Sequence, residues 1–209
     1  MRVRPISPAA LVEELADRIA SAAGHPWLRV AVDGAPATRP GALADALVPA
    51  LRLRGRPALR VSSGYYLRPA SIRLERGRAD PDVYYEDWLD VRGLTREVLD
   101  PLAPGGTGRV LPTLWDPVTD RATRAAYVDL PPGGVLLLSG DLLLGAGLPF
   151  DLAVHLTMSA AALARHTPDE LRWTLPAYAR YATEVGPETV ADVAVRLDDP
   201  RHPALVEAV

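Results

Sequence analysis

The chain has 209 residues, of which 48% are hydrophobic, and a formal net charge of −3. This composition suits one α/β domain with a substantial core, and the negative charge without any basic cluster argues against a nucleic-acid-binding surface. The chain contains no cysteine and all 23 basic residues are arginine, which excludes a thiol nucleophile, a cysteine metal site and a Schiff-base lysine.

The first predicted element is an amphipathic helix within residues 1–26. Ser7 and Pro8 suit its cap and first turn, aliphatic residues four apart share one face, and Gly24 ends it. Acidic residues interrupt any apolar segment of the signal-peptide kind. The sequence therefore predicts no targeting segment, and we expect a cytoplasmic protein.

The central predicted feature is a strand followed by a glycine-bearing turn and a helix. Residues 28–32 are a short β-branched run, typical of a strand buried on both faces, and Gly34 ends it. Thr38 followed by Pro40 suits a helix N-terminus, and leucines at four-residue spacing share one face of that helix. Pro49 is expected to end or kink the helix.

This turn has the layout of a phosphate-binding loop, which requires Gly, four residues, Gly, Lys and then Ser or Thr. Gly34 fits the first position, but Arg39 replaces the second glycine, Pro40 the lysine and Gly41 the hydroxyl residue. Proline also removes one N–H donor. Arg39 still offers a positive charge at the helix N-terminus. The candidate phosphate-binding residues of this loop are Gly34, Thr38, Arg39 and Gly41.

A second strand is predicted over residues 58–62, and it leads into a tyrosine pair. Tyr65 and Tyr66 follow close to the carboxyl end of this strand, where α/β sheets place ligands. They are either stacking groups for a base or sugar, or packed loop aromatics. The following residues, 67–80, are rich in charge and are expected to be exposed.

Several short motifs occur one after another along the chain. They are VAVDG at 30–34, Tyr84-Tyr85 with Asp87 and Asp90, Asp100-Pro101-Leu102 with Gly105-Gly106, Asp116 with Asp120, Pro176-Ala177-Tyr178 with Tyr181, Ala191-Asp192, and Asp199-Pro200. In this order and over most of its length, the chain resembles the actinobacterial uridine kinase-like branch of the P-loop nucleoside kinases.

The resemblance implies a single P-loop NTPase domain over 1–209, a three-layer α/β sandwich with a mainly parallel sheet. Within it, 64–130 would be the region on the substrate side and 159–175 a shortened lid. The ligand implied is a nucleoside-like small molecule, with a protein partner as the alternative, and no nucleic acid or membrane. The candidate substrate contacts are Tyr65, Tyr66, Tyr84, Tyr85 and Asp87.

The chain departs from the family pattern where catalysis takes place. The family carries an acidic motif after its second strand, whereas this chain has Gly64 followed by two tyrosines. The strand predicted from residue 134 leads to Ser139 at the position of an acidic Walker B-like residue. Asp141 lies two residues further on and is a candidate substitute. No catalytic residue and no metal ligand is therefore assigned.

The apolar run 134–150 has two interpretations, a membrane span or a buried strand and loop. Asp141 in its middle, together with glycines and a proline, favours the strand and loop. Residues 151–156 are predicted to form another parallel strand. His155 within it is either a hydrogen-bonded core side chain or a ligand-binding group.

The C-terminal part is expected to hold a short helix over 159–165, a helix opening at 167–170 and a last strand over 190–197, before an acidic tail. Arg165 and Arg172 lie where the family carries its arginine-rich lid. They either hold an anion or are solvated helix arginines.

Two hypotheses follow. In the first, the protein is a pseudokinase, a binding module that keeps the sheet and lacks phosphoryl transfer. In the second, it is an active phosphotransferase that uses ATP or GTP with Mg²⁺, and Arg39, Arg165 and Arg172 supply the missing positive charge. Only the second hypothesis requires a cofactor.

Overall fold

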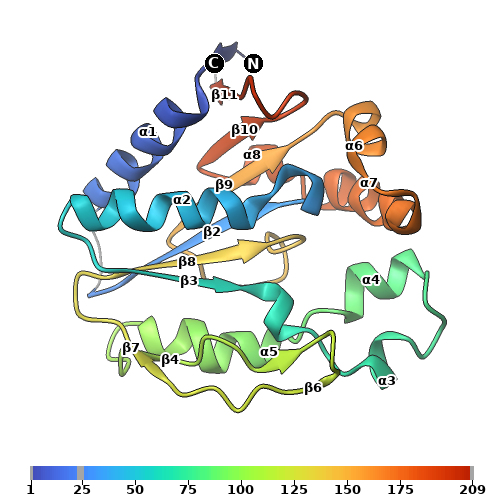
Figure 1. The fold of residues 1–209 in the computed structure, drawn as a ribbon, viewed down its shortest axis with the longest axis horizontal. Helices are drawn as coiled ribbons and strands as arrows, with labels where there is room; N and C mark the ends of the chain where they lie inside the picture. Colours follow the sequence, from blue (N-terminus) through green and yellow to red (C-terminus); the bar gives the residue numbers. More distant parts are fainter. Residues whose placement is uncertain (1, 23–25, 208–209) are drawn as a thin grey trace.

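The computed structural model describes residues 2–22 and 26–207. Within this part of the chain, a seven-stranded sheet runs in the order β1-β11-β10-β9-β2-β8-β3 (Figure 1). The five strands from β10 to β3 are parallel, and β11 and β1 extend the sheet as antiparallel strands. The strands are β1 (Arg2–Pro5), β2 (Leu28–Gly34), β3 (Ala58–Ser62), β8 (Val135–Gly140), β9 (Leu152–Thr157), β10 (Val193–Arg196) and β11 (Ala204–Glu207).

Helices cover both faces of this sheet (Figure 1). They are α1 (Pro8–Ser21), α2 (Pro40–Leu53), α3 (Ala70–Arg73), α4 (Pro81–Asp87), α5 (Val91–Leu94), α6 (Ala160–His166), α7 (Leu175–Glu184) and α8 (Pro187–Val190). Two small antiparallel ribbons lie between β3 and β8 in the chain: β4 (Arg109–Val110) with β7 (Val128–Asp129), and β5 (Trp115–Asp116) with β6 (Arg121–Ala122).

The central strand β2 is buried along its whole length, as expected for a parallel strand between two helical layers. Because side chains alternate along a strand, Val30 and Val32 pack with α1 and α2, whereas Ala31 packs with Tyr181 of α7 on the other face. A further cluster on that second face joins Leu136 and residues of α5. The predicted three-layer α/β sandwich is confirmed.

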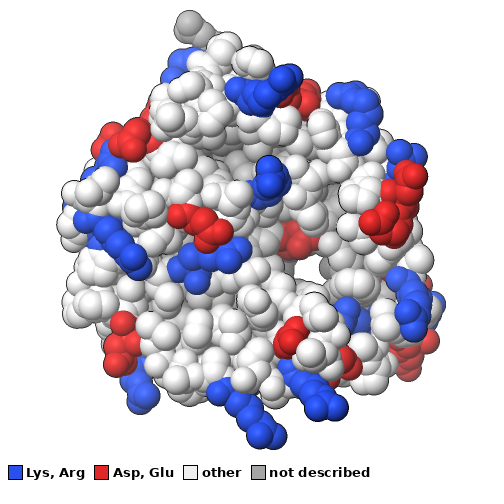
Figure 2. Space-filling model, viewed as in Figure 1, with Lys and Arg blue, Asp and Glu red and all other residues white. Residues whose placement is uncertain are grey.

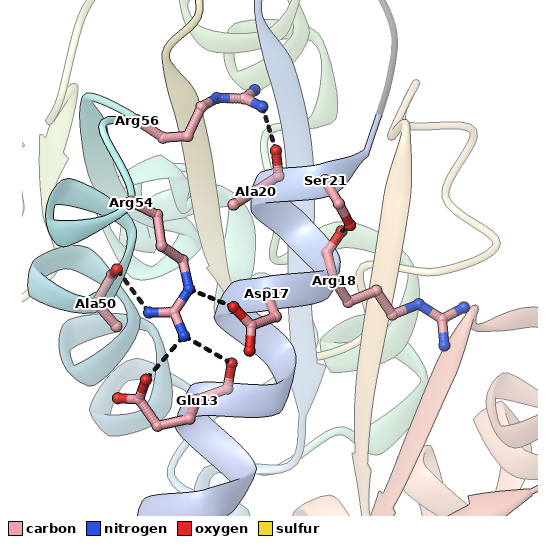
Figure 3. Close-up of polar contacts among 8 residues, drawn as sticks. All are labelled: Glu13, Asp17, Arg18, Ala20, Ser21, Ala50, Arg54 and Arg56. Carbon is pink, nitrogen blue, oxygen red and sulfur yellow. Dashed lines mark hydrogen bonds and ion pairs between the residues drawn. The ribbon is translucent and has the colours of Figure 1, made fainter.

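An arginine joins the two helices of the first face (Figure 3). Arg54, directly after α2, donates to Asp17 at 2.7 Å and to Glu13 at 2.8 Å, both on α1. Arg56 donates to the carbonyl of Ala20 near the end of the same helix. These contacts link α1 to the end of α2 and the turn that follows it.

The structure corrects three expectations about the elements. Strand β2 continues through Gly34, because both of its edges pair in parallel with neighbouring strands. Helix α2 does not end at Pro49, since Leu47 and Leu51 on either side are fully buried. Burying each leucine stabilises by about 1.5–3 kcal/mol, which together offsets the roughly 3 kcal/mol cost of an internal proline.

The third correction concerns the C-terminal residues, where the last strand is β11 rather than the one predicted over 190–197. Its pairing with β1 joins the two ends of the described chain, a long-range contact without a local signal. Residues 167–170 open a 3-10 turn, Asp169–Thr174, before α7. The predicted helix stop at Gly24 lies outside the described residues. None of the helices in the described ranges is long and apolar enough to cross a membrane.

Candidate functional site

The loop between β2 and α2 is folded back on itself. Pro36–Thr38 forms a single 3-10 turn, and Arg39 closes it in the left-handed region with φ 58°. The amide of Thr38 donates to the carbonyl of Ala35 at 2.8 Å, and the amide of Arg39 donates to the carbonyl of Pro36 at 3.0 Å. Helix α2 then begins at Pro40, which has no N–H to offer.

Gly34 allows this loop to lie against the neighbouring strand. A Cβ atom at this position would lie 2.7 Å from the carbonyl oxygen of Leu156 and 2.5 Å from the hydroxyl of Thr38. The hydroxyl of Thr38 instead donates to the carbonyl of Ala35. It stabilises the turn rather than capping α2.

A cavity of about 390 Å³ opens at the carboxyl ends of β3 and β8. On the face shown in Figure 2 the surface is hollowed in this region, and acidic and basic side chains are interspersed around it. The lining includes two carboxylates and no arginine or histidine. The residues are Ser63, Gly64, Leu67, Tyr84, Tyr85, Glu86, Trp88, Leu89, Val91, Asp141, Leu142, Leu144, Gly145, Ala146 and Tyr181.

Asp141 is the polar centre of this cavity wall. Its Oδ2 atom accepts hydrogen bonds from the hydroxyls of Tyr84 and Tyr178, the latter at 2.7 Å. Burial raises the pKa of Asp141 above its ordinary value of 3.8. Burial, together with the charge of this carboxylate, also raises the pKa of both tyrosines, which therefore remain hydrogen-bond donors.

A second carboxylate, Asp33, links four elements from within the core. Its side chain is fully buried and accepts from the amide of Leu143 at 2.9 Å and from the hydroxyl of Tyr181 at 3.0 Å. Its Oδ2 atom also lies 2.6 Å from Nδ1 of His155. The hydrogen-bonded interpretation of His155 is therefore confirmed. The imidazole also lines a second cavity of about 290 Å³ between β9, α7 and α8.

Arg60, a residue of β3 that the sequence analysis did not single out, extends its guanidinium to the start of α2. The Nε atom of Arg60, on β3, donates to the hydroxyl of Ser139 at 3.1 Å. A Cβ atom at Gly41 would lie 2.6 Å from a terminal nitrogen of the same guanidinium and 4.0 Å from the Ser139 hydroxyl. Asp45 is a further, more exposed partner at 3.6 Å.

The structure brings some of the predicted substrate contacts together and separates others. Tyr84 and Tyr85 line the larger cavity. Tyr66 is fully buried in the core, where its hydroxyl donates to the carbonyl of Leu111. Tyr65 is 41% exposed, and Asp87 pairs with an arginine at 3.0 Å; neither lines the cavity.

The predicted phosphate-binding residues are similarly divided. Thr38 lines the second cavity, and Gly34 and Gly41 provide close backbone approach. Arg39, Arg165 and Arg172 are exposed, and none of them lines either cavity. Arg172 pairs within its own turn with an aspartate three residues earlier, at 3.0 Å.

Sequence reasoning missed Asp33, Tyr178, Tyr181 and Arg60 as members of this region. Asp33 carried the clearest signal, because a carboxylate directly follows the apolar run Val30–Val32 near the end of a strand predicted to be buried. Arg60 alternates with apolar residues in a short edge strand and carried no such signal.

No protein-family model and no curated protein matches this sequence. Solved structures do share its fold. A possible uridine kinase from Bacillus stearothermophilus superposes with a TM-score of 0.71 at 20% identity, covering 89% of this chain and 97% of that one. The YGR205w protein superposes with a TM-score of 0.63 at 11% identity, covering 95% of this chain and 97% of that one. A candidate fructose transport system kinase from Silicibacter sp. TM1040 superposes with a TM-score of 0.58 at 22% identity, covering 89% of this chain and 95% of that one.

These likenesses define the class: the chain has the fold of the uridine kinase-like P-loop kinases, as predicted. P-loop NTPases hold Mg²⁺ with a loop Ser or Thr and an acidic residue at the end of a neighbouring strand. At these two positions the chain has Gly41 and Ser139, and the guanidinium of Arg60 contacts both. This set of donors does not fit a divalent cation.

Proposed function

We propose that this protein is a kinase-fold binding protein that takes a neutral, nucleoside-like molecule in its larger cavity and does not transfer phosphate. The observation that carries the proposal is the state of the loop after β2. Of its amides, those of Thr38 and Arg39 donate to carbonyls of the same turn, and Pro36 and Pro40 have none.

A phosphate-binding loop works because successive backbone N–H groups point outward at the anion while a lysine supplies charge. Here two of the donors, the amides of Thr38 and Arg39, are engaged within the turn, and no lysine is present in the chain. The three arginines that could compensate are exposed and lie outside both cavity linings. These features support the binding-protein proposal over the active-phosphotransferase hypothesis.

The larger cavity, by contrast, is formed and has a definite chemistry. The rings of Tyr85 and Trp88 line the cavity, each with an arginine guanidinium over one face. Asp141 offers an acceptor held in place by two tyrosine hydroxyls. Glu86 pairs with Arg180 at 2.8 Å, so Asp141 sets the polar character of the lining. Because no arginine is among the lining residues, the cavity favours a ligand that donates hydroxyl hydrogen bonds over a phosphorylated one. A nucleoside combines a ring for stacking with such hydroxyls.

The test is a binding and turnover experiment on the full chain with uridine, cytidine, adenosine and their monophosphates. We expect at least one nucleoside to raise the melting temperature and to quench the fluorescence of Trp88, whereas its monophosphate does neither. We expect no phosphorylated product with MgATP or MgGTP.

Two variants locate the effect. Asp141→Asn keeps an acceptor for the tyrosines but loses the charge, and should weaken nucleoside binding by about tenfold, equivalent to a hydrogen bond to a charged group. Asp129→Asn is the matched control, because that side chain is 82% exposed and distant from the cavity lining. Phosphorylation of a nucleoside by the purified protein would contradict the proposal, as would the absence of binding by every nucleoside tested.

A further inference from the structure

The position that holds Mg²⁺ in P-loop NTPases contains a side chain of this protein. We propose that the guanidinium of Arg60 replaces the divalent cation at the start of α2 and excludes it. The chain then carries its own positive charge at this position and needs no metal there.

The sheet geometry brings the relevant groups to one face. Arg60 and Ser139 lie on the adjacent parallel strands β3 and β8, two residues apart in register, so their side chains point to the same side. This is the side covered by α2, whose first turn contains Gly41. The Nε atom of Arg60 donates to the Ser139 hydroxyl at 3.1 Å. Ser139 as a residue is only 1% exposed.

The two departures from the metal-binding pattern are each explained by this arginine. A serine or threonine at position 41 would place its Cβ atom 2.6 Å from a terminal nitrogen of Arg60, so the guanidinium would have to leave its present position. Glycine leaves the room that the guanidinium needs. Ser139 accepts the hydrogen bond of Arg60 without adding a buried charge.

The charge of Arg60 opposes a second cation at the same place. The carboxylate that pairs with it is that of Asp45, which lies 3.6 Å away and whose side chain is 64% exposed. A surface pair of this kind is strongly screened and leaves the guanidinium as the local positive charge. A divalent cation between Gly41 and Ser139 would therefore meet both steric overlap and repulsion.

The experiment introduces an acidic residue at position 139 and determines whether Arg60 or Mg²⁺ neutralises its charge. Ser139→Asp is made alone, with Arg60→Gln and with Arg60→Lys, and the melting temperature of each protein is measured in EDTA and in excess MgCl₂. Glutamine keeps a long polar side chain without charge, whereas lysine keeps the charge. Ser139→Asn in the same three backgrounds is the matched neutral control.

If Arg60 replaces the metal, Ser139→Asp is paired with the guanidinium, is stable in EDTA and does not respond to Mg²⁺. The Arg60→Lys combination behaves in the same way. The Arg60→Gln combination is destabilised in EDTA and is rescued by Mg²⁺, by roughly 3–6 °C when the metal is at about ten times its dissociation constant. Neither result depends on whether the cavity binds a nucleoside.

Two outcomes overturn the proposal. One is a Mg²⁺-dependent stabilisation of Ser139→Asp with Arg60 in place, because the metal then coexists with the guanidinium. The other is a response of the Arg60→Gln combination no larger than that of its Ser139→Asn control. If this combination fails to fold, Ser139→Asp alone remains decisive, since its carboxylate has a partner and its response to Mg²⁺ is measurable.

Discussion

Removing Asp33 should destabilise the protein more than any other single change at a polar residue of the site. The Asp33→Ala variant leaves the buried amide of Leu143 and the hydroxyl of Tyr181 without an acceptor, and it frees the imidazole of His155. The side chain of Asp33 is fully buried, so water reaches these groups only through the space left behind.

Each buried donor without a partner costs about 1–3 kcal/mol, and two of them give a loss of roughly 4 kcal/mol. For a domain of this size that loss corresponds to a fall of about 8–16 °C in melting temperature. Asp33→Asn should lose less, because its carbonyl oxygen still accepts from the amide of Leu143.

The assay is urea unfolding of the full chain at neutral pH, followed by circular dichroism. Asp129→Ala is the control; its side chain is 82% exposed, and we expect a change below about 0.5 kcal/mol. A loss of less than about 1 kcal/mol for Asp33→Ala would refute the reasoning, because the three contacts would then contribute no net stability.

Three further predictions concern the loop and the cavity. Because the pKa of Asp141 is raised above 3.8 in the folded state, its ionisation opposes folding, so wild-type stability should fall as the pH rises through this raised pKa. Asp141→Asn should lack this decline. If the free energies of unfolding of the two proteins changed in parallel from pH 4 to pH 8, Asp141 would not be the group responsible. Gly34→Ala should cost about 1–3 kcal/mol, because its Cβ atom meets the backbone oxygen of Leu156, whereas Gly64→Ala has only an ordinary contact at 3.4 Å and should be nearly neutral in the same denaturation assay. Pro40→Lys should not create Mg²⁺-dependent ATP binding, since the amides of Thr38 and Arg39 still donate within the turn. Calorimetry is the assay, and binding of MgATP to this variant would show that the loop lacked only a positive charge.

Much of the fold could be predicted because its signals are local. The run at 28–32 had to be buried on both faces, and the leucines of α2 repeat with the period of a helix. Strands β1 and β11 escaped prediction, since each is four residues long and is stabilised by pairing with the other end of the chain. Helix α2 also continues through Pro49 rather than ending there, because the burial of the neighbouring leucines outweighs a local rule.

The sequence by itself determined the α/β class, the absence of lysine and cysteine chemistry, and the residues Arg39, Pro40 and Gly41 where the phosphate-binding pattern has Gly, Lys and Ser or Thr. Only the tertiary structure decided which distant side chains come together. His155 and Tyr181 lie more than a hundred residues after Asp33 yet both contact its buried carboxylate, and Arg60 reaches Ser139 only because β3 lies beside β8. Such contacts depend on strand order and register, which arise from the packing of the whole sheet and leave no trace in the spacing of residues along the chain.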